Sequence, residues 1–119
     1  MTTHLSRTDL DDLRGALERE RNKLRTALAE TEREGRGIAV EENDDADTAG
    51  RMTDQDDALR LAGFDRALLA DVDRALAKLD AGTYGTSEDS GALIPLERLR
   101  AMPWARRTRE EEDRHQRQR

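Results

Sequence analysis

The sequence contains no cysteine in its 119 residues, which excludes disulfides, thiolate chemistry and cysteine-ligated metal sites. Aromatic residues are almost as scarce, with one each of Trp, Tyr and Phe. No apolar run approaches the roughly 20 residues that cross a membrane, and no signal-peptide pattern opens the chain. We therefore expect a cytoplasmic protein that makes no membrane contact.

Charged residues make up 40% of the chain and hydrophobic residues only 34%. This composition is too poor in apolar side chains for a thick globular core, and it favours long solvated helices that pair along a narrow stripe. The net charge of −6 argues against binding nucleic acid through its phosphates. We expect no direct DNA binding, and a partner whose surface is basic.

Two leucine-rich stripes have the spacing of paired helices. The first helix is predicted from Thr8, with Asp11 completing a capping pair, to about Glu34; Gly35 and Gly37 are expected to end it. Its stripe consists of Leu10, Leu13, Leu17, Leu24 and Ala27.

The second stripe begins at Ala58, and Gly82 is expected to close its helix at the C′ position. Its further members are Leu61, Leu68, Val72, Ala75 and Leu79. Two such stripes joined by a polar link predict a mostly α fold with a long antiparallel coiled-coil hairpin over residues 1–81. Its tip is expected at about residues 35–50. Residues 82–119 are expected to form a small finger-like region and a C-terminal helix.

The link between the helices is strongly acidic. Eight acidic residues and one basic residue lie between Glu41 and Asp57, which a solvated charge run alone would explain. Asp44 and Asp47 are three residues apart, so they would share one face of a helical turn, and Ala49 is small enough to allow close approach. Carboxylates at such a tip could pair with Arg or Lys, or approach Mg²⁺ in a partner.

The segment Gly82 to Pro103 resembles the C-terminal zinc finger of the DksA/TraR family. The family pattern reads roughly G-x-Y-G-x-C-x-x-C-G, then I-P-x-x-R-L-x-A-x-P, then C-x-x-C. The matching residues are Gly82, Tyr84, Gly85, Gly91, Ile94, Pro95, Arg98, Leu99, Ala101 and Pro103. The four cysteine places fall on Ser87, Ser90, Thr108 and Glu111. Asp44, Asp47 and Ala49 also match the D-x-x-D-x-A tip signature of the DksA branch.

The resemblance implies a non-enzymatic bacterial transcription regulator that binds RNA polymerase directly and inserts its tip into the secondary channel. Asp44, Asp47 and Ala49 would then act near the polymerase active site. Further polymerase contacts are expected from Arg98 and from three arginines of the tail, Arg106, Arg107 and Arg109. Asp71 and Met102 stand where some members carry basic residues for ppGpp, so we do not expect dependence on ppGpp. We expect a monomer.

Zinc requires thiolate or imidazole ligands, and three hydroxyls with one carboxylate do not supply them. We therefore expect no metal and no cofactor, and a finger region ordered by packing and backbone hydrogen bonds. The expected anchors are Tyr84, Leu93, Ile94, Leu96, Leu99, Met102 and Trp104. After Trp104, the alternation of arginines and acids predicts a solvated terminal helix, with a nucleic-acid arm as the alternative.

Two other functions remain open. A helical-hairpin adaptor that does not bind polymerase would need neither the tip residues nor a finger. Catalysis by the acidic cluster is disfavoured because no His, Cys or Gly-rich loop accompanies it and a turn at the end of a hairpin lacks a cleft.

Overall fold

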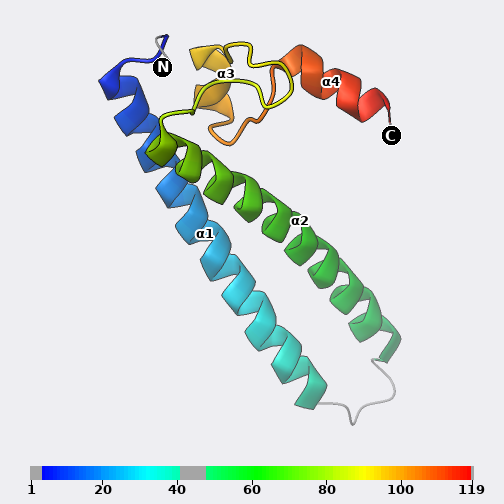
Figure 1. Ribbon diagram of the computed structural model, residues 1–119. Coiled ribbons are helices and arrows are strands. Elements are labelled where there is room, and N and C mark those ends of the chain that lie inside the picture. The colour runs from blue at the N-terminus through cyan, green and yellow to red at the C-terminus, as the bar shows by residue number, and fades with distance from the viewer. Residues whose placement is uncertain (1–3, 41–47, 119) are drawn as a thin grey trace. The chain divides into compact units, whose positions relative to one another are not determined.

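The computed structural model describes residues 4–40 and 48–118, with side chains for residues 4–33 and 57–118. Four helices occur in these residues (Figure 1): α1 (Arg7–Val40), α2 (Thr48–Ala81), α3 (Leu96–Ala101) and α4 (Arg109–Arg117). The antiparallel course of α1 and α2 confirms the predicted mostly α hairpin. Within the described residues the only β pairing is an isolated antiparallel bridge between Thr86 and Leu93.

Contacts divide the chain into two units. One consists of Met1–Arg21 and Ala70–Arg119, and the other of Asn22–Leu69. The first unit therefore combines the beginning of α1, the end of α2 and the whole finger region, while the second holds the rest of the two long helices. The division that we predict from the sequence, at residue 81, stays a prediction.

The first helix begins at Arg7, and its capping residue lies two residues earlier than the sequence predicts. The Asp9 N–H donates to Ser6 Oγ at 3.0 Å, and the Ser6 N–H donates to Asp9 Oδ2 at 3.0 Å. This reciprocal pair is a capping box, so the predicted pair of Thr8 and Asp11 is wrong. The backbone hydrogen bond from Ser6 is also the main reason why the pKa of Asp9 is lowered.

The first helix also ends later than predicted. It continues through Gly35 and Gly37 to Val40. A glycine inside a helix costs only about 1 kcal/mol relative to alanine, and each residue added to an existing helix gains a hydrogen bond. The two glycines therefore do not end α1.

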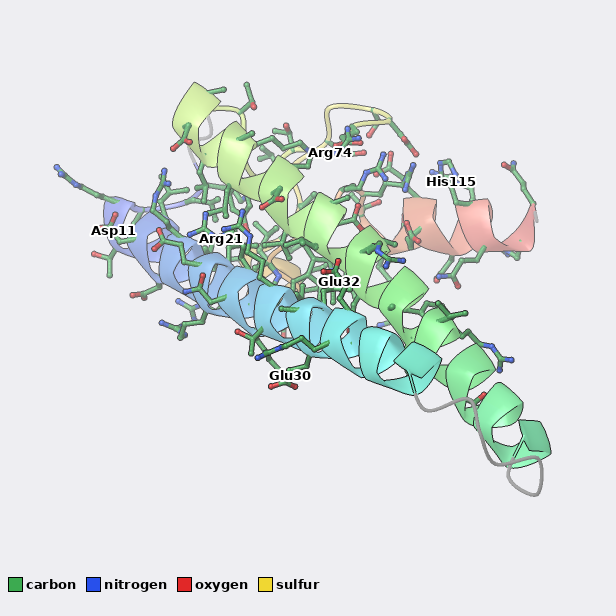
Figure 2. All side chains as sticks on the ribbon, turned by 90° about the horizontal axis from the view of Figure 1, so that it is seen from below. Asp11, Arg21, Glu30, Glu32, Arg74 and His115 are labelled. Carbon is green, nitrogen blue, oxygen red and sulfur yellow. The ribbon has the colours of Figure 1, made fainter. Side chains whose placement is uncertain are left out.

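The seam between α1 and α2 agrees with the predicted stripe on α1. Leu13, Leu17 and Leu24 are buried, and charged residues such as Asp11 and Glu30 project outward from α1 (Figure 2). On α2 the buried residues include Val72 and Ala75, as predicted, together with Ala62 and Leu76. Leu61, however, is exposed. Successive helical residues are rotated by about 100°, so a seam that passes through Ala62 leaves Leu61 on its flank.

The end of α2 is a Schellman motif, which confirms the role predicted for Gly82. The Thr83 N–H donates to the Lys78 carbonyl at 2.9 Å, and the Gly82 N–H donates to the Leu79 carbonyl at 3.3 Å. Gly82 has a φ of +75°, a conformation that glycine adopts without steric cost. The motif turns the chain sharply from α2 into the finger region.

The finger region is anchored by three of the predicted residues. Tyr84, Ile94 and Leu99 are buried, and the Tyr84 hydroxyl donates to the Pro103 carbonyl at 2.8 Å. Burial raises the pKa of Tyr84, so the phenol stays protonated as the donor. His4 Nε2 donates to the Ile94 carbonyl at 2.8 Å, which fastens the start of the chain to this region.

Two predicted anchors are wrong. Leu93 and Met102 are exposed, because both face an open groove beside α3 and α4.

No helix within the described residues is long and apolar enough to span a membrane.

Two glycine substitutions in α2 and at its end should change stability in opposite directions. Gly82→Ala should destabilise the protein by about 1–2 kcal/mol, because alanine is strained in the left-handed conformation. Gly63→Ala should stabilise it by about 0.5–1 kcal/mol, because Gly63 lies within α2 and a Cβ there would meet nothing within 4 Å. Urea unfolding followed by circular dichroism measures both. Equal effects of the two variants would contradict the C′ assignment.

Candidate functional site

Two of the three residues singled out at the predicted acidic tip lie outside the described residues. Asp44 and Asp47 lie in the segment between α1 and α2 that the structure does not describe. Ala49 is the second residue of α2, which begins at Thr48. The roles predicted for these three residues therefore stay predictions.

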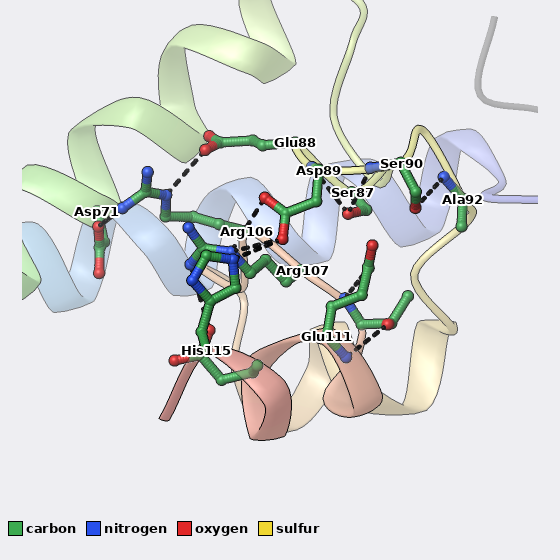
Figure 3. Close-up of polar contacts among 12 residues, drawn as sticks. Asp71, Ser87, Glu88, Asp89, Ser90, Ala92, Arg106, Arg107, Glu111 and His115 are labelled. Carbon is green, nitrogen blue, oxygen red and sulfur yellow. Dashed lines mark hydrogen bonds and ion pairs between the residues drawn. The ribbon is translucent and has the colours of Figure 1, made fainter. Parts of the chain in front are cut away.

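The four residues at the cysteine places of the finger frame gather in one hydrogen-bonded cluster, which we call the knuckle cluster: Ser87, Ser90, Thr108 and Glu111. Ser87 and Ser90 lie on the turn after α2, whereas Thr108 and Glu111 begin α4. Figure 3 shows the Glu111 side chain extending from α4 toward the turn that carries the two serines. Two segments almost 20 residues apart in sequence therefore meet at this point.

Glu111 is the centre of the knuckle cluster. The Thr108 N–H donates to Glu111 Oε1 at 2.9 Å, and the Glu111 N–H donates to Thr108 Oγ1 at 3.3 Å. These bonds form a capping box at the start of α4. The bond from the Thr108 backbone is the largest of the influences that lower the pKa of Glu111 to about 2, and hydrogen bonds with the hydroxyls of Ser87 and Ser90 come next. Glu111 is only 6% exposed, yet it stays ionised because these donors solvate its charge.

The serine turn is ordered by backbone donors. Ser87 Oγ accepts from the N–H groups of Asp89 at 3.1 Å and Ser90 at 3.4 Å. Ser90 Oγ accepts from the Ala92 N–H at 3.2 Å. The Gly91 N–H donates to the Ser87 carbonyl at 3.0 Å, and Gly91 has a φ of +75°. The two serine hydroxyls thus accept hydrogen bonds from backbone N–H groups of the turn and also hydrogen-bond with the Glu111 carboxylate.

The knuckle cluster does not suit zinc. Its side chains supply three neutral hydroxyls and one carboxylate that is already hydrogen-bonded, whereas structural zinc sites use four thiolate or imidazole ligands. Within the described residues, no group of three or more His, Cys, Asp and Glu side chains is arranged to hold a metal ion. In the described structure, hydrogen bonds of these side chains join the two segments of the knuckle.

Ion pairs connect the serine turn to α2 and to the segment before α4. Glu88 Oε1 lies 2.7 Å from Lys78 Nζ and 3.3 Å from an Arg74 nitrogen, and Glu88 Oε2 lies 2.9 Å from Arg106 Nε. Arg106 also reaches Asp71 at 3.6 Å (Figure 3). Burial alone would raise the pKa of Glu88, but hydrogen bonds and charges from Lys78 and Arg106 lower it to about 2.

A second set of ion pairs involves Asp89. Arg107 Nε lies 3.1 Å from Asp89 Oδ2, and His115 Nε2 lies 2.8 Å from the same oxygen. Arg107 also pairs with Glu112 at 3.3 Å. The Arg98 Nε–H donates to the Arg107 carbonyl at 3.0 Å. The clusters around Glu88 and Asp89 could not be read from the sequence, because their partners are up to 26 residues apart.

An open groove of about 880 Å³ runs between the serine turn, α3 and the start of α4. Leu93 and Met102 contribute its apolar surface, while Arg98 and Arg109 are among its charged residues. Of the four arginines predicted to contact a partner, these two line the groove. The other two, Arg106 and Arg107, are held in the ion pairs described above.

Glu111→Gln should lower the melting temperature at pH 7, because the amide has one acceptor oxygen instead of two and presents N–H donors to the serine hydroxyls. A carboxyl with a folded-state pKa of about 2 stabilises the protein above its unfolded-state pKa of about 4.3. That contribution is lost as the pH falls toward 2. The stability difference between wild type and variant should therefore shrink between pH 5 and pH 2 in thermal melts. Glu110→Gln is the control, and an equal effect of both substitutions would contradict a central role for Glu111.

Metal removal should leave the fold unchanged. Incubation with EDTA, or with a thiol oxidant, should shift the melting temperature by no more than the error of the measurement, because no thiolate is present and hydrogen bonds join the two segments of the knuckle. Differential scanning calorimetry with and without chelator tests this expectation. A fall in melting temperature that added zinc reverses would contradict it.

No protein-family model matches the chain, but individual proteins do. General stress protein 16O of Bacillus subtilis is 52% identical over 58 residues, which are 49% of this chain and 33% of that protein. The RNA polymerase-binding transcription factor DksA of Caulobacter vibrioides is 39% identical over 72 residues, 60% of this chain and 51% of that protein. The chain thus spans about half or less of the length of these curated relatives.

A solved structure provides the more complete comparison. Transcription factor DksA2 from Pseudomonas aeruginosa matches with a TM-score of 0.81 and 30% identity, and the match covers 95% of this chain and 87% of that structure. The likeness includes both long helices and the finger region, so it agrees with the resemblance seen in the sequence. This cysteine-free chain therefore belongs to the DksA/TraR family.

Proposed function

We propose that this protein is a transcription regulator that binds RNA polymerase directly and inserts its acidic tip into the secondary channel to modulate transcription initiation. The observation that carries the proposal is the likeness to DksA2 over 95% of the chain. A relative that is 39% identical is named as an RNA polymerase-binding transcription factor. The regulator would act by binding and not by catalysis.

The length of the long helices supports insertion. Each of α1 and α2 has 34 residues, which corresponds to about 50 Å of helix. The acidic segment with Asp44 and Asp47 joins their ends. In a narrow basic channel, carboxylates there would pair with Arg or Lys or approach a bound Mg²⁺.

The four arginines proposed as polymerase contacts divide into two kinds. Arg98 and Arg109 line the groove beside α3 and α4, so they are available to a partner that covers it. Arg106 and Arg107 carry ion pairs that order the knuckle. We propose that the first two contact polymerase directly and that the other two act mainly by holding the contact surface in shape.

Dependence on ppGpp is not part of the proposal. Asp71 lies 3.6 Å from Arg106, so it both adds negative charge and occupies a neighbouring guanidinium. Asp71 would therefore repel a polyphosphate, and the Arg106 guanidinium would not be free to bind it.

The net charge of −6 favours a basic protein surface over DNA as the partner. We propose that the protein acts as a monomer.

The second candidate is a helical-hairpin adaptor that does not bind polymerase. It accounts for the long helices equally well, but it offers no reason for Asp44, Asp47 and Ala49 to stand at the spacing of the family signature. We therefore rank it second.

Substitution of the tip should separate binding from activity. Asp44→Asn/Asp47→Asn should bind core RNA polymerase with an affinity within about threefold of the wild type, because most of the contact area lies elsewhere. It should lose most of the effect on transcription in vitro, because the tip charge is removed. Asp45→Asn, which removes one acid between the two signature positions, is the matched control and should keep the effect.

Pull-down or interferometry with core polymerase measures binding, and run-off transcription measures the effect. Failure of the wild type to bind would refute the proposal and favour the adaptor. Unchanged regulation by the double variant would refute the role of the tip while leaving polymerase binding intact.

A further inference from the structure

Between residues 57 and 64 of α2, the large apolar side chains point away from the seam of the hairpin. Ala62 is buried in the seam, whereas Leu61 is 64% exposed and Phe64 is 68% exposed. Leu59 is also 63% exposed. The second half of α2 shows the usual arrangement, since Val72 and Leu76 are buried. A helix selected only for pairing would place its leucines and phenylalanine in the seam and its alanines outside.

Two of these exposed residues form one line with a third. Leu61 and Phe64 are three residues apart and Leu68 follows four residues later, so the three side chains are neighbours on the helix surface. We call this line the apolar ridge. Leu68 is only half-buried at its end. Leu59 lies two positions before Leu61, about 200° around the helix, so it belongs to the opposite flank of the seam.

Charged neighbours do not cover the ridge. Asp57 and Arg60, one turn before Leu61 and Phe64, pair with each other at 3.8 Å. They form an ion pair at its edge and leave the apolar atoms in solvent. Contiguous apolar patches of a few hundred Å² on a protein surface are often interaction sites.

The size of the ridge limits its possible occupants. An aromatic side chain buries about 150–250 Å² when covered, so three partly exposed side chains offer a few hundred Å² at most. A stable interface between two copies needs about 800 Å² from each partner. The ridge is therefore too small to hold a dimer by itself, and it fits a contact that adds to a larger interface.

The position of the ridge indicates which interface that is. Leu61 lies 13 residues beyond Thr48, the first residue of α2, which is about 20 Å along the helix. A channel that takes up the acidic segment before Thr48 to a depth of about 20 Å would also contact this part of α2. A lipid surface is disfavoured as the occupant because the chain carries a net charge of −6 and anionic membranes would repel it.

We propose that the apolar ridge of Leu61, Phe64 and Leu68 is a docking contact for an apolar strip on RNA polymerase, beside the opening that receives the tip. This inference rests on the proposed function. The ridge supplies affinity through apolar burial, while the acidic tip supplies the regulatory effect.

The experiment compares substitutions on the two flanks of the same helix. Leu61→Gln/Phe64→Gln removes the ridge, and Leu59→Gln is the matched control because it removes an equally exposed leucine from the other flank. Glutamine retains helix propensity, and circular dichroism checks that all variants keep wild-type helix content. Binding of the full-length proteins to core RNA polymerase is measured by interferometry.

We expect the ridge variant to bind at least about tenfold more weakly than the wild type. Leu59→Gln should bind within twofold of the wild type. Phe64→Leu, which keeps an apolar side chain, should bind within about threefold. Regulation should return at saturating concentrations of the ridge variant, because its tip is intact.

Four outcomes would overturn the inference. Equal binding by the wild type and the ridge variant would refute the ridge alone and leave the proposed function standing. Equal losses of affinity in the ridge variant and in Leu59→Gln would show that binding does not depend on which side of α2 is changed. A wild-type dimer that the ridge variant dissociates in sedimentation would assign the ridge to a second copy of the chain. Absence of wild-type binding would refute both the ridge and the proposed function.

Discussion

The hydrogen bonds to the Glu111 carboxylate are the interaction on which the finger region depends. They join the turn of Ser87 and Ser90 to the start of α4, together with a backbone bond of 2.9 Å from the Glu88 N–H to the Arg106 carbonyl. Bonds to an ionised acceptor are shorter and stronger than bonds between neutral groups. The same turn places Glu88 beside Lys78 on α2 and Arg106 ahead of α4.

The ion pairs of Glu88 then connect the finger region to α2, while the contacts of Asp89 connect the serine turn to α4 and the segment before it. The contacts of Glu88 with Arg106 and of Asp89 with Arg107 and His115 join residues that are 18 to 26 positions apart in the chain. Surface ion pairs are individually weak, but Glu88 is shared among three cations and Arg106 between two acids. The network therefore acts as a unit, and its loss would loosen the groove that we propose as part of the polymerase contact.

Much of the fold could be predicted from the sequence because its signals are local. The spacing of Leu13, Leu17 and Leu24 indicates a seam directly, and Gly82 marks the end of α2 because few other residues adopt its conformation. Register on α2 could not be predicted in the same way. Ala62 and Leu61 are both apolar, and only the position of α1 decides which of them faces inward. The extension of α1 past Gly35 is not evident from the sequence, because a penalty of about 1 kcal/mol per glycine can either end a helix or be offset by its further hydrogen bonds.

The candidate site was predictable in part. The resemblance of the finger frame located the knuckle residues, and the T-x-x-E spacing of Thr108 and Glu111 is itself a capping-box signal. Nothing local connects Glu111 to Ser87 or Ser90, since those contacts depend on how the chain folds back. The exposed position of Phe64 was likewise hidden, because sequence alone cannot tell an apolar residue in a core from one at a surface.

Glu111 has two structural roles, and these roles limit which substitutions the knuckle cluster can accept. The residue caps α4 and also accepts the serine hydroxyls, so a single substitution to cysteine would remove both functions at once. It would create one isolated thiol and no complete set of metal ligands. The same holds for a single change at Ser87 or Ser90. A stepwise change from the present knuckle to four cysteines would therefore pass through intermediates with fewer of these hydrogen bonds and an incomplete set of metal ligands.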